Sequence, residues 1–482
     1  MRQFLIILFS CYSVFANASE FSVSSIEELN IALQKVKAGD IIVWKNGTYN
    51  DTKISFKPIN GGNRNEKIYL KAETAGKVVF KGASNIVVDG NYLQLEGFLF
   101  DGTSRLDKTD VLSFTQNANH SHITNCAIIN YTPNDVSVNN NWMSLQGLYN
   151  EVSYCYFTGK TNQGPYLVVR YKTGKDFVAG SDAAPSTHHH IHHNYFGYRT
   201  MPTDNGGEDM RIGDSKTSFT RGFNIIEYNY FEDQRQEPEI ISNKSCDNIY
   251  RFNTFIANDG AMVLRHGQRC FVYGNYINGK TGRNTSGGLR IINSNQTVFS
   301  NYVTNVESSE KVALKAGVVI MCGLENSEIN GYYAADSAVV AYNTFINCAG
   351  PVVKVGVGNK SKGQPLIAPK EITLVSNVFI NSYGKENKAI VEYDAVTYTA
   401  CRNNFYTNGG SAGIKGFQQM KEKEIIKVGE FVTAKFNVDD AVLNLINQRL
   451  AVHSINLTNQ EITTFNPKWK INKNEVGVSW IK

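Results

Sequence analysis

Short apolar runs separated by Asn, Gly and Asp fill most of the chain. Their β-branched and aromatic content, and the turn-forming residues between them, are typical of short β-strands and not of helices. Near the N-terminus we expect strands at 40–44, 67–72, 77–81, 85–89 and 93–100. The pattern therefore predicts an all-β protein.

Two segments have a helical period instead. Residues 24–39 open with Ser and Glu in a capping-box pattern, carry their apolar residues on one stripe and end at Gly39. Residues 438–450 form the second candidate. We expect the first helix to cap the N-terminal end of a stack of strands, as the terminal units of repeat proteins require. We expect residues 411–482 to form a C-terminal cap region of the same domain.

An Asn followed by two β-forming residues recurs through the middle of the chain. The four central copies are separated by 24, 22 and 26 residues, a period typical of a solenoid built from short strands. Asparagines at equivalent turns would hydrogen-bond up the stack. We therefore predict a right-handed parallel β-helix over residues 19–410. The copies begin at Asn194, Asn229, Asn253, Asn275, Asn301, Asn343 and Asn377.

The first eighteen residues have the features of a signal peptide. Arg2 supplies the charge, residues 4–15 an apolar core too short to span a bilayer, and Ala16-Asn17-Ala18 a cleavage pattern. We expect export to the periplasm or the medium. Cys11 loosely fits a lipoprotein signal, so a lipid-anchored form is an alternative.

The net charge and the cysteine pattern exclude some classes of protein. The formal net charge of +5 is mild, and the sequence has no basic, aromatic-rich block of the kind that binds nucleic acid. No other segment approaches transmembrane length. The seven cysteines after Cys11 form no CxxC pair and are interpreted as small core residues.

Acidic and basic residues gather between 237 and 290. Glu237 and Glu239 flank Pro238 and point to one face of an extended segment, so they can share a cation. Lys244, Arg265 and Arg290 precede the repeat asparagines of their turns by 9, 10 and 11 residues. We therefore predict a row of positive charge along the stack, with Lys244 and Arg265 as neighbours.

This combination suggests cleavage of an acidic polysaccharide by β-elimination. A base removes the C5 proton of a uronic acid, and the glycosidic bond at C4 breaks. Ca²⁺ on oxygen ligands can stabilise the negative charge that develops on the adjacent carboxylate. A lysine near cations can serve as the base.

Three segments resemble polysaccharide lyase family 6, the alginate lyases and chondroitinase B. They are Asn205 to Arg211, Glu237 to Ser245 and Leu264 to Gly267. The resemblance covers nearly all of the chain after residue 18. It implies that Asn205, Glu237 and Glu239 bind Ca²⁺, that Lys244 is the base and that Arg265 is the proton donor.

The resemblance also matches His266 to a histidine beside that arginine, and we expect it to bind substrate. If β-strand alternation holds, His266 would instead face inward with Leu264. Arg290 is a further substrate-binding candidate. Alginate is the favoured polymer and dermatan sulfate the alternative.

Two other classes remain open. A hydrolase on the same fold would use Glu237 and Glu239 as its two carboxylates, and a non-catalytic β-helix would bind a glycan without turnover. The histidines between His188 and His193 lack Cys or acidic partners at ligand spacing, so a transition-metal site is disfavoured. Part of this cluster could lie near the cleft. The sequence does not indicate the oligomeric state.

Overall fold

The computed structural model describes residues 18–172, 185–200, 205–235, 237–279, 286–308, 313–358, 363–383, 388–407, 414–421, 424–434 and 438–481. The predicted signal peptide, Cys11 included, lies almost wholly outside the described residues. The predicted domain boundary at 410 also lies outside them. Among the described helices, none is long and apolar enough to cross a membrane.

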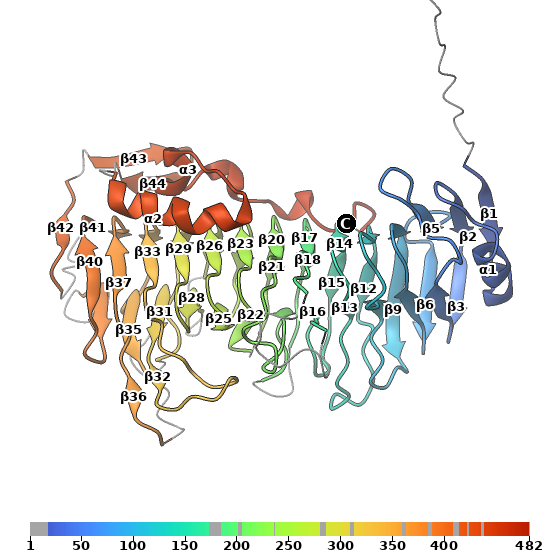
Figure 1. The fold of residues 1–482 in the computed structure, drawn as a ribbon, viewed down its shortest axis with the longest axis horizontal. Coiled ribbons are helices and arrows are strands. Elements are labelled where there is room, and N and C mark those ends of the chain that lie inside the picture. Colours follow the sequence, from blue (N-terminus) through green and yellow to red (C-terminus); the bar gives the residue numbers. More distant parts are fainter. Residues whose placement is uncertain are drawn as a thin grey trace, which may run out of the picture.

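Three long parallel sheets, here called A, B and C, run the length of the molecule (Figure 1). From β2 to β41 the chain visits them in the order A, B, C and then repeats, so each turn of the coil adds one strand to each sheet. Every pairing within the three sheets is parallel. This is the parallel β-helix that the sequence predicts.

Sheet A has fourteen strands: β1 (Glu20–Val23), β2 (Ile41–Trp44), β5 (Ile68–Ala72), β8 (Leu93–Glu96), β11 (His122–Thr124), β14 (Glu151–Ser153), β17 (His190–His192), β20 (Ile225–Glu227), β23 (Ile249–Arg251), β26 (Phe271–Tyr273), β29 (Thr297–Phe299), β33 (Val339–Ala341), β37 (Ile372–Val375) and β40 (Tyr398–Arg402).

Sheet B also has fourteen: β3 (Gly47–Asn50), β6 (Val78–Gly82), β9 (Phe98–Ser104), β12 (Ala127–Ile129), β15 (Tyr156–Thr158), β18 (Tyr195–Phe196), β21 (Tyr230–Glu232), β24 (Thr254–Ile256), β27 (Tyr276–Asn278), β30 (Tyr302–Thr304), β34 (Thr344–Ile346), β38 (Val378–Ile380), β41 (Asn404–Tyr406) and β42 (Phe417–Gln419).

Sheet C has twelve: β4 (Lys53–Phe56), β7 (Asn85–Val88), β10 (Leu112–Phe114), β13 (Met143–Leu145), β16 (Leu167–Val169), β19 (Met210–Ile212), β22 (Glu239–Lys244), β25 (Ala261–His266), β28 (Leu289–Ile291), β31 (Val318–Met321), β35 (Val353–Val357) and β39 (Ile390–Glu392). Two antiparallel pairs stand apart: β32 (Gly323–Leu324) with β36 (Leu366–Ile367), and β43 (Ile425–Val428) with β44 (Phe431–Ala434).

The predicted asparagine ladder is present. Asn194 Nδ2 donates to Asn229 Oδ1 at 2.9 Å, and the same bond recurs at each later copy up to Asn377. Asn404, which the sequence pattern did not include, accepts the next bond from Asn377 at 3.0 Å. Each ladder side chain is buried and satisfies backbone groups of its neighbours, so the ladder ties successive turns together.

The strand predicted at 93–100 is divided into β8 and β9. Gly97 stands between them with a φ of +88°, a conformation that turns the chain from sheet A to sheet B. The predicted cysteines fit the core: six are buried, Cys401 is half-buried, and none of these seven forms a disulfide within the described residues.

The helices lie outside the coil. α1 (Ile26–Leu33) begins at the N-cap Ser25, whose side chain accepts a hydrogen bond from Glu28 N, and it lies at the N-terminal end of the coil (Figure 1). α2 (Asp440–Leu450) confirms the second helix. The remaining helical turns are η4 (Ala451–His453), α3 (Asn459–Thr463), η5 (Pro467–Trp469) and η6 (Lys473–Glu475).

The C-terminal segment packs along the flank of the coil, which differs from an end cap. Apolar residues of α2 such as Ile446 and Leu450 are buried with Phe271 and Phe299 of sheet A. The segment then runs back along the coil (Figure 1), and Trp480 donates a hydrogen bond to Asn125 Oδ1 at 2.9 Å. Its described part covers apolar outer residues of sheets A and B.

Candidate functional site

The predicted base and proton donor lie on the neighbouring strands β22 and β25 of sheet C. Asn243 pairs with Leu264, but a bulge follows, so that Lys244 pairs with His266 and Arg265 is the extra residue. The prediction that Lys244 would stack directly on Arg265 is therefore wrong by one residue. The two side chains still come from the same end of adjacent strands.

The bulge also changes the position of His266. Strict alternation would have turned it inward with Leu264, whereas the extra residue resets the alternation at the strand end. The ring is only 2% exposed, and its Nδ1 lies 3.3 Å from Arg265 Nη1. Burial, helped by the charges of Arg265 and Lys244, lowers the pKa of His266 to about 2, so the ring is neutral.

Arg265 is held by a loop from the C-terminal side. Its Nη1 donates to the carbonyl of Gly331 at 2.9 Å, and its guanidinium lies 4.1 Å from the centroid of the Tyr332 ring. Such a cation–π contact restrains the side chain without neutralising it. Sequence reasoning did not find Gly331 or Tyr332, because their loop is 66 residues further along the chain.

The predicted acidic pair joins this site to the loop that begins at Asn205. Glu237 precedes β22, is 1% exposed and accepts a hydrogen bond from Gly207 N at 2.8 Å. Glu239 opens β22 and accepts from Ser242 Oγ at 2.5 Å. Asn205 is exposed on the same loop as Gly207. Glu237 is therefore tied by a hydrogen bond to the loop that carries Asn205, and Glu239 lies two residues after Glu237.

Glu208 is a site residue to which the sequence reasoning assigned no role. It is 3% exposed, and its Oε1 lies 3.8 Å from Lys244 Nζ. Its Oε2 is buried and has no hydrogen-bond partner among the residues described here. The signal was its place in the loop with Asn205, but nothing in the sequence separated it from a solvated glutamate.

The electrostatics of these carboxylates fit a cation. Burial, helped by the neighbouring charges of Glu208 and Glu239 and opposed by the hydrogen bond from Gly207 N, raises the pKa of Glu237 to about 8. Oxygen donors of this kind suit Ca²⁺. Within the described ranges, no group of three or more His, Cys, Asp or Glu side chains is arranged to hold a metal. The assignment of Ca²⁺ to Glu237, Glu239 and Asn205 stays a prediction.

Arg290 does not continue the row that the sequence predicted. In the register of sheet C it pairs with Val263, which pairs with Ser242, two residues before Lys244. Its guanidinium is 4% exposed and its Nη2 lies 3.0 Å from Glu239 Oε1. The predicted row of three cations is therefore wrong, and Arg290 lies against a predicted calcium ligand.

The histidine cluster lies elsewhere. His190 and His192 belong to β17 of sheet A, where they contact Glu227 and Glu151 at 2.8 and 2.9 Å. The His188 ring stacks between the rings of Tyr149 and Phe223. His190 and His192 are therefore on a different sheet from Lys244 and Arg265, which belong to sheet C.

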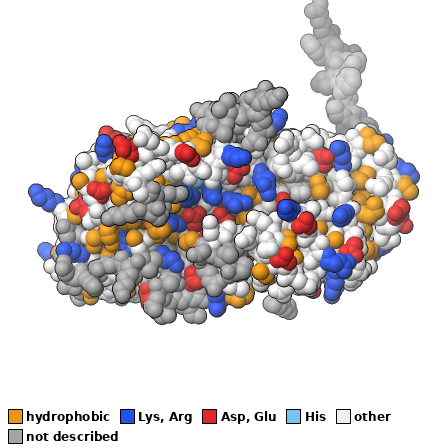
Figure 2. Space-filling model, turned by 90° about the horizontal axis from the view of Figure 1, so that it is seen from below, with side chains coloured by type: hydrophobic (Ala, Val, Ile, Leu, Met, Phe, Trp, Pro, Cys, Tyr) orange, Lys and Arg blue, Asp and Glu red, His pale blue; other side chains and the backbone are white. Residues whose placement is uncertain are grey.

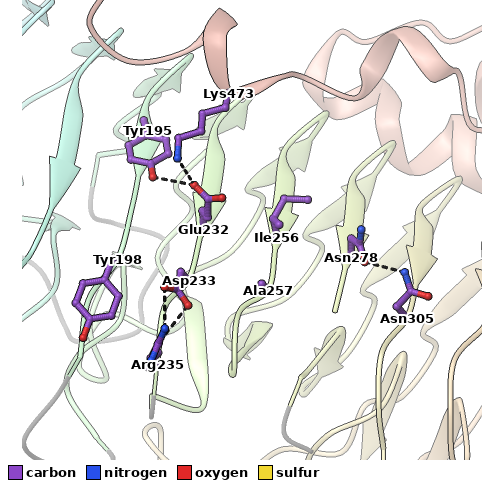
Figure 3. Close-up of a pocket in the computed structure, with 10 residues that line it drawn as sticks. All are labelled: Tyr195, Tyr198, Glu232, Asp233, Arg235, Ile256, Ala257, Asn278, Asn305 and Lys473. Atoms are coloured by element: carbon purple, nitrogen blue, oxygen red, sulfur yellow. Dashed lines mark hydrogen bonds and ion pairs between the residues drawn. The ribbon is translucent and has the colours of Figure 1, made fainter. Parts of the chain in front are cut away.

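A hollow of about 610 Å³ lies on sheet B, close to the C-terminal segment (Figure 3). Its charged groups are paired with one another: Tyr195 and Lys473 both contact Glu232, and Arg235 contacts Asp233 at 3.1 Å. None of the predicted site residues lines it. The predicted base and proton donor, Lys244 and Arg265, lie on sheet C instead. The face seen in Figure 2 gathers Lys, Arg, Asp and Glu side chains near the middle of its length.

The chain is similar to one known protein family and to several solved structures. A family model described as chondroitinase B matches residues 23–447. No curated protein matches the chain. Many solved structures match the chain.

A structure of the family 6 alginate lyase AlyGC is 29% identical, with a TM-score of 0.82, over 96% of this chain and 59% of that one. This chain thus spans about three fifths of that protein. A mannuronic-acid-specific family 6 lyase from human gut microbiota is 24% identical, with a TM-score of 0.71, over 96% of both chains. A family 6 polysaccharide lyase from Pseudopedobacter saltans is 23% identical, with a TM-score of 0.68, over 92% of this chain and 99% of that one. The latter two support the fold.

Proposed function

Because this chain belongs to the chondroitinase B family, we propose that it is a polysaccharide lyase that cleaves a uronate-containing polymer by calcium-assisted β-elimination. The observation that carries the proposal is the placement of Lys244, Arg265 and His266 at one end of β22 and β25, with the buried Glu237 and the partly buried Glu239 at the start of β22. Alginate is the proposed polymer, because AlyGC is an alginate lyase.

Each polar side chain has a task in this reaction. Asn205, Glu237 and Glu239 would hold Ca²⁺, which when bound would act as a Lewis acid on the uronate carboxylate. Lys244 Nζ takes the proton from C5. Arg265, fixed by Gly331 and Tyr332, donates a proton to, or stabilises, the leaving oxygen at C4.

The neutral His266 ring adds no charge beside Arg265 and offers a nitrogen to the substrate. Lys244 has only Glu208 as a charged partner in the described part of the chain, and the 3.8 Å separation is at the long limit of an ion pair. The lysine is therefore free to turn towards a bound sugar. Arg290 would help to orient Glu239 and would contact the substrate beside it.

The test is absorbance of the unsaturated product. The protein is incubated with alginate and, separately, with dermatan sulfate, each with Ca²⁺ and with a chelator. We expect a calcium-dependent rise on alginate, since elimination leaves a C4–C5 double bond. New reducing ends without absorbance would instead indicate hydrolysis, and binding without products a non-catalytic glycan-binding protein.

Dermatan sulfate is the second candidate because the matching family model is that of chondroitinase B. A rise on dermatan sulfate alone would select it. We also propose that the chain is exported with loss of residues 1–18. Mass determination of the protein recovered from the periplasm or medium tests this, and retention of Met1, or a lipid on Cys11, would contradict it.

A further inference from the structure

A hollow of about 210 Å³ lies where the strands of sheet C end, on the N-terminal side of the site. Gln116, Gln146 and Arg170 line it. These residues follow β10, β13 and β16, in the same way that Lys244 ends β22. None of them was singled out by the sequence.

The strand register places Arg170 in line with Lys244. Val169 pairs with Ile212, and Ile212 pairs with Asn243. The next residue on each strand is Arg170, Gly213 or Lys244, so these three occupy one row. Two strand spacings separate Arg170 from Lys244, roughly 10 Å.

Gly213 keeps the path between the two cations open. It has a φ of +88°, and a Cβ at this position would lie 2.6 Å from the carbonyl oxygen of Lys244. A side chain is therefore disfavoured twice, by conformation and by contact. Within the row itself, the position between Arg170 and Lys244 carries no side chain, because it is Gly213.

Arg170 has hydrogen-bonding capacity to spare. Its Nη2 lies 3.9 Å from Asp110 Oδ2, and its side chain is 45% exposed. Asp110 is engaged elsewhere, since its Oδ1 accepts from Asn141 N at 3.0 Å and from Asn141 Nδ2 at 2.8 Å. A guanidinium presents five N–H donors in a fork that matches a carboxylate.

We propose that Arg170 forms a subsite that binds the carboxylate of a uronate unit of the polymer, two strands from Lys244 towards the N-terminal end of the coil. The amide of Gln146, next in the row, would bind hydroxyl groups of the same unit. This inference rests on the proposed function, because it assumes a polyuronate lying along sheet C. It restores a row of cations along the stack, with Arg170 in place of Arg290.

The test compares Arg170→Ala and Arg170→Lys with wild type on alginate oligosaccharides of increasing length and on the polymer. For substrates long enough to reach the subsite, Arg170→Ala should raise KM about tenfold or more, because a charge-assisted hydrogen bond is lost. kcat should stay within about twofold, as expected when uniform binding is removed. Arg170→Lys should restore part of the loss, since it keeps the charge but not the fork.

Arg105→Ala is the matched control, since Arg105 also pairs with an aspartate, Asp51, on the exposed surface of the N-terminal part of the coil. It should leave both constants unchanged. An unchanged KM for Arg170→Ala at every length, or a loss in kcat alone, would overturn the subsite.

Failure of the proposed function has a different signature, namely a wild type that releases no product. The affinity of the same proteins for alginate oligosaccharides is then measured by titration calorimetry. Weaker binding by Arg170→Ala than by wild type and by Arg105→Ala would support the subsite, and equal binding would overturn it.

Discussion

Lys244 pairs with His266 across sheet C, and Arg265 is the residue by which β25 exceeds its partner. The bulge brings a lysine, an arginine and a neutral histidine to the end of two strands. In regular strands, Arg265 and His266 would face opposite sides of the sheet. The extra residue therefore lets both take part in one site.

Substitution of the proposed base and donor should abolish turnover. Lys244→Ala and Arg265→Ala should each lower kcat by roughly 10²-fold to 10⁴-fold, the usual contribution of a positioned acid or base. Absorbance of the unsaturated product measures the rate, and circular dichroism checks the fold. Lys216→Ala, on the exposed surface, serves as the control. Activity of Lys244→Ala near that of wild type would remove Lys244 from the mechanism.

Calcium dependence should map to Glu237 and Glu239. Glu237→Gln and Glu239→Gln should lose activity and weaken Ca²⁺ binding, which titration calorimetry measures without any substrate. We expect at least a tenfold loss of affinity, since one charged ligand is removed. Glu73→Gln, which removes an exposed partner of Lys45, should bind Ca²⁺ as wild type does. Equal binding by all three variants would place the calcium site elsewhere.

The fall in stability between neutral and acid pH should depend in part on Glu227. Burial alone would raise its pKa, but hydrogen bonds and charge from His190 and Arg251 outweigh burial and lower the pKa from 4.5 to about 2. A lowered folded-state pKa stabilises the protein above about pH 4.5, and this contribution is lost as the pH falls towards 2.

Glu227→Gln should therefore lower the free energy of unfolding by up to about 3 kcal/mol at pH 7, and by much less near pH 2. Urea unfolding at several pH values measures the difference. A deficit that is the same at pH 7 and pH 2.5 would show that the ion pairs are not its source.

The asparagine ladder should be the most sensitive part of the coil. Asn275 donates to Asn301 and accepts from both the backbone N–H and the side chain of Asn253. Asn275→Ala leaves these buried groups unpaired, at a cost of about 2 kcal/mol or more. Thermal unfolding should show the loss, while Asn65→Ala, on an exposed turn, should unfold as wild type does. Equal midpoints would contradict the ladder's role.

The coil could be predicted from sequence because its signals are local and repeated. Asn253, Asn275 and Asn301 recur once per turn, and each satisfies the same backbone groups. The site was predicted less completely, because it depends on register. Lys244, Arg265 and Arg290 precede their asparagines by 9, 10 and 11 residues, and a slip of one residue exchanges the faces of a strand.

The structure shows two different outcomes of this change in spacing from 9 to 11 residues. At Arg265 the bulge adds one residue to β25, so that this side chain still lies at the same end of the strands as Lys244. In the described register of β28 with β25 no bulge precedes Arg290, which therefore lies in another row of sheet C. A bulge leaves no mark in a single sequence, and neither does the approach of Tyr332 to Arg265 from a distant loop. Glu208 and Arg170 were missed for a related reason. Each is linked to Lys244 only by the position of a neighbouring strand, which the sequence does not give.

The C-terminal segment has a consequence for biosynthesis. Phe271 and Phe299 of sheet A are buried under α2, and Thr254 donates a hydrogen bond to the carbonyl of Ile471 at 3.0 Å. A ribosome makes Phe271 and Phe299 well over a hundred residues before α2, and it makes Thr254 217 residues before Ile471. Synthesis runs at roughly 5–20 residues per second. For that interval the nascent coil presents an apolar flank. Chaperone binding is therefore expected at the middle turns and should end when the last residues emerge.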